Sequence, residues 1–153
     1  MDMIKVYLKG NRAVFVKIDH LKISKTIMEE LEQNSSKEIK LDMGCDMFEV
    51  ILKFCKHYVK EKTKEPNLLE NTNFKTFSTD WDKLFFQDDI MNTKFEGAFE
   101  TEKEKEILIL SKYVRAAHIL KINHLYNLIC LKISESFLNQ SIGQILLNLE
   151  IES

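Results

Sequence analysis

The residues of this chain that could do chemistry are its histidines, cysteines and paired carboxylates, and their spacing assembles no common catalytic or metal site. His118 and His124 lie six residues apart, about 240° around a helix, so one helix could not direct both at the same metal ion. Cys45 follows a glycine, but no histidine stands in a recognisable relation to it, and the sequence has no glycine-rich phosphate loop and no Gly-x-Ser-x-Gly motif. Asp88 and Asp89 are adjacent, a pattern typical of a solvated acidic pair. We therefore expect no catalysis, no bound metal and no cofactor.

The composition predicts one folded domain. The 153 residues are 44% hydrophobic and 30% charged, with only four glycines and one proline. A formal net charge of −2 is too balanced to hold a phosphate backbone, so we expect no nucleic-acid partner. No apolar run approaches the ~20 residues of a membrane span, and we expect no signal peptide or anchor. The odd cysteine count and the absence of a C-x-x-C pair favour a reducing compartment, the cytoplasm or the nucleus.

The first half of the chain carries strand patterns and then helix patterns. Residues 4–8 and 13–18 are rich in β-branched and aromatic side chains and flank a Gly-Asn turn, which predicts a β-hairpin. A helix capped by Asp19 and interrupted near Ser24 should follow, and residues 39–41 should form a short third strand. Over residues 46–58 apolar side chains recur at i, i+3, i+4, i+7, i+8 and i+11, which is typical of one face of a helix.

The second half should be helical after a long connection. Residues 60–80 contain the single proline and several Asn and Thr residues, which predicts a surface loop. A helix should begin near Trp81, and the charged stretch 92–106 has the composition of an insertion that joins the next helix from about Glu102. That helix should end in a turn at residues 120–123.

The helix predicted over residues 124–138 is apolar on more than one side. One stripe consists of leucines, and a second stripe contains Tyr126, Cys130, Ile133 and Phe137. A final short helix after Ser141 could cover the second stripe in part. Two outcomes are open at this point: the stripe is a partner site that is exposed in the free chain, or it is sealed in the core.

Several short motifs, taken in chain order, resemble one known family. They are Ile4-Lys5-Val6, Thr26-Ile27, Ile39-Lys40-Leu41, the segment from Ile51 to Tyr58 with its Phe-Cys-x-His pattern, Trp81-Asp82 followed by Phe85, and the run from Ala116-Ala117 through Leu120 and Ile122 to Ile151. Their order is similar to that in the S-phase kinase-associated adaptor subunits of SCF cullin–RING ubiquitin ligases, which carry a BTB/POZ fold. The chain resembles a divergent member with an insertion at 92–106 and a carboxyl terminus shorter than that of its relatives.

The resemblance implies an α+β protein with a BTB/POZ domain over residues 1–122 and F-box-binding helices over residues 123–153. The implied function is a non-catalytic adaptor that links an F-box substrate receptor to a cullin. The implied F-box contacts are Tyr126, Cys130, Ile133, Phe137, Ile145, Leu149 and Ile151. The implied cullin contacts are His118 and Ile119, which replace an asparagine and a tyrosine of the family, so we expect altered or weakened cullin binding.

Two other functions remain open for the same fold. One is a self-associating BTB/POZ scaffold, in which the apolar stripes would close a homodimer when no partner is bound. The other is an elongin-C-like subunit that binds no F-box protein. The Trp81-Asp82 motif and the residues that follow Ala116-Ala117 favour the F-box adaptor over the elongin-C-like subunit.

Overall fold

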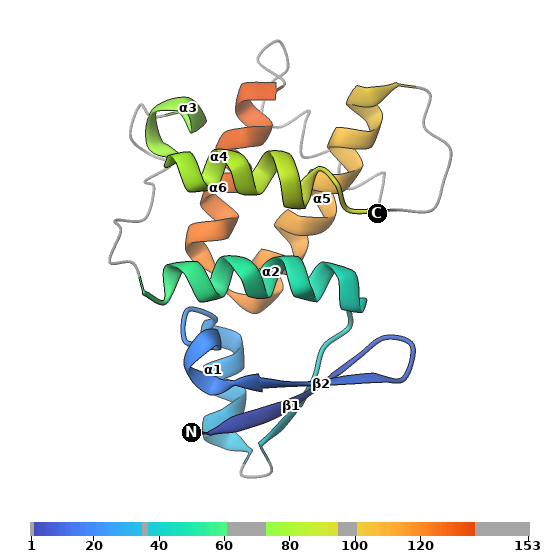
Figure 1. The fold of residues 1–153 in the computed structure, drawn as a ribbon, viewed down its shortest axis with the longest axis vertical. Helices are drawn as coiled ribbons and strands as arrows, with labels where there is room; N and C mark the ends of the chain where they lie inside the picture. Colours follow the sequence, from blue (N-terminus) through green and yellow to red (C-terminus); the bar gives the residue numbers. More distant parts are fainter. Residues whose placement is uncertain (1, 35–36, 61–72, 95–100, 137–153) are drawn as a thin grey trace. The chain divides into compact units, whose positions relative to one another are not determined.

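The computed structural model describes residues 2–34, 37–60, 73–94 and 101–136, which are coloured along the sequence in Figure 1. The chain divides into two compact units. Unit 1 comprises Met1–Lys64 and Ile119–Ile122, and unit 2 comprises Glu65–His118 and Asn123–Ser153. These units are defined by packing. Their boundaries differ from the predicted division at residues 122 and 123, which separates an expected BTB/POZ domain from expected F-box-binding helices.

Unit 1 contains a small mixed sheet. Strand β1 (Met3–Leu8) pairs antiparallel with β2 (Arg12–Lys17) and parallel with β3 (Glu38–Lys40), so the strand order is β2-β1-β3. Gly10 and Asn11, between β1 and β2, have φ angles of 79° and 58°, the left-handed conformations that glycine and asparagine adopt most easily. The predicted hairpin and third strand are therefore confirmed.

The first helix of unit 1 begins later than the sequence suggested. Ile18–Leu21 forms a single 3₁₀ turn (η1), and α1 (Lys25–Gln33) starts after Ser24, whose Oγ accepts a hydrogen bond from the Ile27 N–H at 3.3 Å. The predicted cap, Asp19, instead pairs with Lys22 at 3.0 Å. The expectation that Asp19 caps this helix is wrong, because its carboxylate is engaged by a neighbouring ammonium group while the Ser24 hydroxyl meets the helix donors.

The second helix of unit 1, α2 (Cys45–Tyr58), confirms the predicted helix. Its buried side chains are Phe48, Ile51, Phe54, Cys55 and Tyr58. Met47 and Val50, which the periodicity also placed on the inner face, are half-buried. The buried face is therefore turned slightly toward Phe48.

Unit 2 begins with short helices around an aromatic cluster. They are α3 (Phe74–Phe77), α4 (Asp80–Phe85) and the π-helical segment η2 (Phe86–Ile90). The prediction of a loop over residues 60–80 is wrong for α3, because the buried Phe74 ring packs edge-on against Phe86 with centroids 4.9 Å apart. Residues 61–72 of that predicted loop lie outside the described residues.

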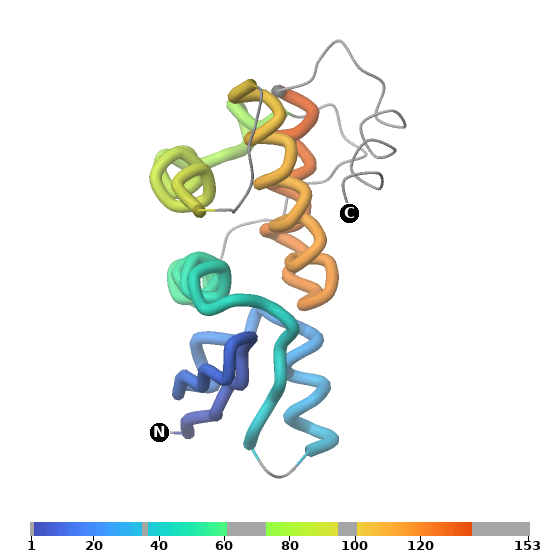
Figure 2. The backbone as a smooth tube through the Cα atoms, turned by 90° about the vertical axis from the view of Figure 1, so that its right-hand side faces the viewer, coloured from blue at the N-terminus to red at the C-terminus, as the bar shows by residue number. Residues whose placement is uncertain are grey.

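The two long helices form an antiparallel hairpin, as Figure 2 shows. Helix α5 (Glu102–Leu120) begins where the charged stretch was predicted to become helical, and α6 (Asn123–Ser136) covers most of the predicted C-terminal helix. Two residues separate them, and Lys121 turns the chain with a φ of 52°. The predicted turn at 120–123 is confirmed, whereas the final helix expected after Ser141 lies outside the described residues.

The α+β class is confirmed. Within the described ranges, none of the helices combines the length and the apolar character that crossing a bilayer would require.

Candidate functional site

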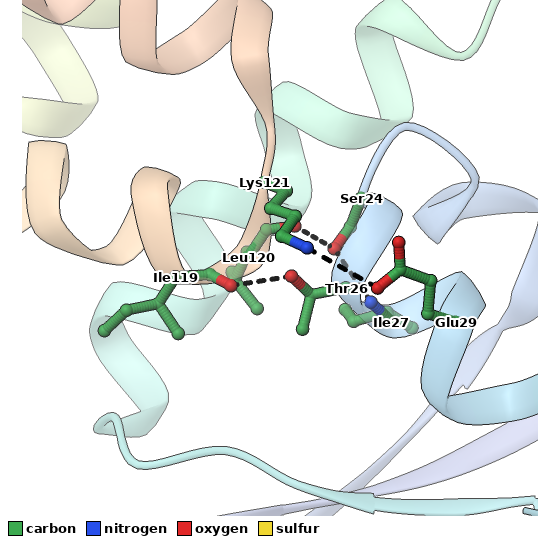
Figure 3. Close-up of polar contacts among 7 residues, drawn as sticks. All are labelled: Ser24, Thr26, Ile27, Glu29, Ile119, Leu120 and Lys121. Atoms are coloured by element: carbon green, nitrogen blue, oxygen red, sulfur yellow. Dashed lines mark hydrogen bonds and ion pairs between the residues drawn. The ribbon is translucent and has the colours of Figure 1, made fainter. Parts of the chain in front are cut away.

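The candidate site of unit 1 lies where α5 ends, at residues 119–122 (Figure 3). A helix leaves its last carbonyl groups without partners in the helix itself. Here two hydroxyl groups from the start of α1 donate hydrogen bonds to these carbonyl groups. Ser24 Oγ donates to the Leu120 carbonyl at 2.6 Å, and Thr26 Oγ1 donates to the Ile119 carbonyl at 2.7 Å.

Further contacts reinforce this junction. The Lys25 N–H donates to the Lys121 carbonyl at 3.4 Å, and Lys121 Nζ lies 3.6 Å from a carboxylate oxygen of Glu29. The start of α1 therefore supplies hydrogen-bond donors to the carbonyl groups of Ile119, Leu120 and Lys121. Ser24 both caps α1 and holds the end of α5, because its hydroxyl can donate one hydrogen bond while accepting another.

This arrangement fixes a backbone and leaves one large side chain in solvent. Ile119 is 59% exposed, whereas Leu120 and Ile122 beside it are about 1% exposed. Because the Ile119 carbonyl is already bonded to Thr26, a partner that covered the side chain would not have to order the backbone first. Ile119, one of the two predicted cullin contacts, is thus available to a partner.

His118, the other predicted cullin contact, belongs to unit 2 and is exposed. Its ring centroid lies 5.7 Å from that of Tyr126 on α6, and the rings are tilted by 45°. The structure therefore brings a predicted cullin contact and a predicted F-box contact close together.

The predicted F-box contacts on α6 differ in exposure. Tyr126 and Cys130 are half-buried, but Ile133 is only 8% exposed. Of the two outcomes left open for the second stripe, Ile133 follows the buried one, because the packing of unit 2 buries several sides of α6, including Leu128, Ile129 and Leu131. Phe137, Ile145, Leu149 and Ile151 lie outside the described residues.

The thiols in these elements are poor nucleophiles. Burial raises the pKa of Cys55 to about 12. Burial also raises the pKa of Cys130, and charge on Cys130 together with partial burial raises the pKa of Tyr126. Burial therefore disfavours the thiolate at both positions, and the thiolate is the nucleophilic form of cysteine. Among the described residues, no cluster of histidine, cysteine and carboxylate groups could hold a metal ion.

A second feature of unit 2 is a cleft of about 540 Å³ with an aromatic wall and a charged rim. Phe74 and Phe86 contribute to its lining, and Lys132 Nζ lies 5.0 Å above the Phe74 ring. Lys132 Nζ also lies 3.5 Å from Glu135 Oε1. The sequence reasoning missed this cleft, since the only local signal was the i, i+3 spacing of Lys132 and Glu135 on one helix.

The sequence also did not predict that Ser24 and Thr26 bind the carbonyl groups at the end of α5. The sequence indicated a helix break near Ser24, but nothing local to that segment predicts hydrogen bonds to residues more than ninety positions away. Neither the models of known protein families nor the curated proteins include a match to this chain.

Proposed function

We propose that this chain is a non-catalytic adaptor that links an F-box substrate receptor to a cullin in an SCF-type ubiquitin ligase. The observation that carries the proposal is the exposure of Ile119 on a backbone held by α1. An apolar side chain on a pre-ordered backbone gains solvent exclusion in a complex and loses little conformational entropy. This combination suits an anchor in a protein–protein interface.

The position of this anchor agrees with the motif resemblance. Ile119 and His118 occupy the two positions at which the similar family contacts its cullin, and both are exposed. The isoleucine can fill an apolar pocket, whereas it cannot form the hydrogen bond of the tyrosine it replaces. The cullin surface that fits this chain is therefore more apolar at this point than one built for a tyrosine.

The F-box contact is best centred on the half-buried residues of α6. Tyr126 and Cys130 keep part of their surface in solvent, so a partner helix could cover them without unfolding unit 2. Ile133 would then support this surface from within the core of unit 2. The motif resemblance favours binding over catalysis.

The cullin contact is tested by an Ile119→Asp variant and a matched Leu84→Asp control. Leu84 is 58% exposed, almost the same as Ile119, so both variants replace an exposed apolar side chain with a carboxylate. We expect Ile119→Asp to weaken binding of a cullin amino-terminal region from the same organism by about tenfold or more in isothermal titration. The control should bind normally. Equal affinity for the two variants, or no binding by the unmodified chain, would contradict the proposal.

The F-box contact is tested by light scattering. The unmodified chain should form a 1:1 complex with a peptide containing an F-box, whatever its state alone. A tight dimer that the peptide does not change would instead favour the self-associating scaffold.

A further inference from the structure

The β1–β2 hairpin has one face on which Met3, Phe15 and Lys17 are exposed and Lys5 and Tyr7 are half-buried. Strand alternation buries Ile4, Val6 and Val16 on one side of the sheet and turns their neighbours to the other side. These neighbours are Met3, Lys5, Tyr7, Phe15 and Lys17, which we call the hairpin outer face. The register places Met3 opposite Lys17 and Lys5 opposite Phe15, so the five side chains form one patch.

The patch is unusually apolar for an exposed surface. Phe15 is 67% exposed and Met3 is 43% exposed. In the described part of the chain, four large hydrophobic residues are exposed, and these are two of them. A buried phenylalanine contributes more to stability than an exposed one, so a ring left in water on an ordered strand indicates a surface that another molecule can cover.

The same patch carries the positive charges of Lys5 and Lys17. Lys5 Nζ lies 4.9 Å from the centre of the Tyr7 ring and 5.9 Å from that of Phe15. Neither Lys5 nor Lys17 makes an ion pair with another described residue. The nearby acids Asp2 and Asp19 are paired with other lysines.

Charge on the surrounding residues varies across the sheet. Glu38 lies opposite Lys5 on β3, so the field is most positive toward β2. Beyond β2, partial burial and the charges of Lys56, Lys17 and Lys60 lower the pKa of His20. Lys17, Lys56 and Lys60 therefore all lie close enough to His20 to act on it electrostatically.

We propose that the hairpin outer face binds an extended acidic segment of another protein that carries one aromatic or aliphatic residue. The apolar residue packs on Phe15 and Met3, while flanking carboxylates pair with Lys5 and Lys17. In the described sheet β2 pairs only with β1, so its other edge can accept main-chain hydrogen bonds from an added strand. Lysines at such an edge discourage pairing with a like-charged strand and favour an acidic one.

An acidic peptide fits better than a nucleic acid because the positive field is local. The whole chain has a formal net charge of −2, so a long polyanion that continued past the patch would meet repulsion. This binding site uses none of the residues proposed to contact a cullin or an F-box protein. It does not depend on the adaptor function.

The proposal is tested by selecting peptides from a random display library on the full chain. We expect the enriched sequences to be acidic with an aromatic or aliphatic residue. Lys5→Glu and Phe15→Ala should each weaken binding of the best synthetic peptide by about tenfold or more. The matched controls are Lys94→Glu, which reverses the charge of an exposed lysine in unit 2, and Leu84→Ala, which truncates an exposed apolar residue there. Both controls should bind normally.

The unmodified chain supplies a second measurement that does not depend on a variant folding. Titration with the selected peptide should shift backbone amide signals of residues 3–17 in NMR spectra. The proposal is overturned if no acidic sequence is enriched, if the shifts fall only in unit 2, or if the controls lose as much affinity as the hairpin variants. Tighter binding of a fifteen-nucleotide oligo(dT) than of the peptide, lost in Lys5→Glu, would also overturn it in favour of a single-stranded nucleic acid.

Discussion

Ile119 and Ile133 were both expected to face a partner, and the structure treats them differently. Ile119 is the last residue but one of α5, belongs to unit 1 and is 59% exposed, whereas Ile133 lies near the end of α6 in unit 2 and is 8% exposed. At Ile119 the packing partner, α1, binds the backbone carbonyl and leaves the side chain in water. At Ile133 the side chain itself is packed. An apolar side chain on a helix is thus available to a partner only where the neighbouring elements contact the backbone and leave the side chain exposed.

The largest effect that separates the two positions should come from an added carboxylate. We expect Ile133→Asp to lower the free energy of unfolding by about 3–5 kcal/mol, because it leaves an unpaired charge in a buried site and removes apolar packing. Ile119→Asp should change the same quantity by less than about 0.5 kcal/mol. Urea denaturation followed by circular dichroism measures both.

A conservative variant tests whether packing is the cause. Ile133→Val removes one methylene and should cost about 0.5–1.5 kcal/mol. If Ile133→Asp were as stable as Ile119→Asp, Ile133 would be accessible in solution, and the contrast between the two isoleucines would not hold.

A smaller effect should follow from removing the hydroxyl that holds the end of α5. Ser24→Ala takes away the α1 cap and leaves the Leu120 carbonyl without its donor in a buried site, which should cost about 2 kcal/mol. Thr26→Val removes a single, more exposed hydrogen bond to Ile119 and should cost about 1 kcal/mol.

The affinity of Thr26→Val for the cullin fragment tests whether the held backbone matters for binding. If the held backbone is what makes Ile119 an anchor, Thr26→Val should weaken binding of the cullin fragment although it does not alter the Ile119 side chain. Unchanged affinity in Thr26→Val would show that the exposed side chain alone accounts for binding.

The smallest effect concerns pH and unit 1. Partial burial and three lysines lower the pKa of His20 below its ordinary value of 6.5, so the native state prefers the neutral ring. As the pH falls below about 6.5 the unfolded chain takes up this proton first, and stability should decrease with falling pH until the ring of the native state is also protonated. Thermal unfolding of the unmodified chain should therefore show a steeper fall in Tm between about pH 7.5 and 5.5 than His20→Gln does. Parallel curves would contradict the lowered pKa.

Much of the secondary structure was predictable because its causes are local. The β-branched runs around Gly10-Asn11 specify the hairpin, and the apolar spacing of residues 46–58 specifies α2. The α3 helix was missed because a four-residue helix has too few turns to show a period. Its stability comes from the contact of Phe74 with Phe86, which lies twelve positions further along the chain.

The candidate site was predictable in part. Motif resemblance selected His118 and Ile119, and both are exposed. It also selected Ile133, which is buried, because an apolar stripe on a helix has the same spacing whether a partner or the core covers it. The sequence predicted the hairpin but not its register, and the register places Phe15 opposite Lys5.

The sequence by itself determined the α+β class, most of the helices and strands, and the absence of any recognisable catalytic motif, because these depend on spacing and residue type within short segments. Only the tertiary structure decided which apolar residues remain in water. The hydroxyl of Ser24 binds the carbonyl of Leu120 across a separation of 96 residues, and that contact leaves the neighbouring Ile119 side chain exposed on a fixed backbone. Burial is set by such long-range contacts. An isoleucine can therefore be an exposed anchor in one helix, as Ile119 is in α5, and part of the core in the next, as Ile133 is in α6.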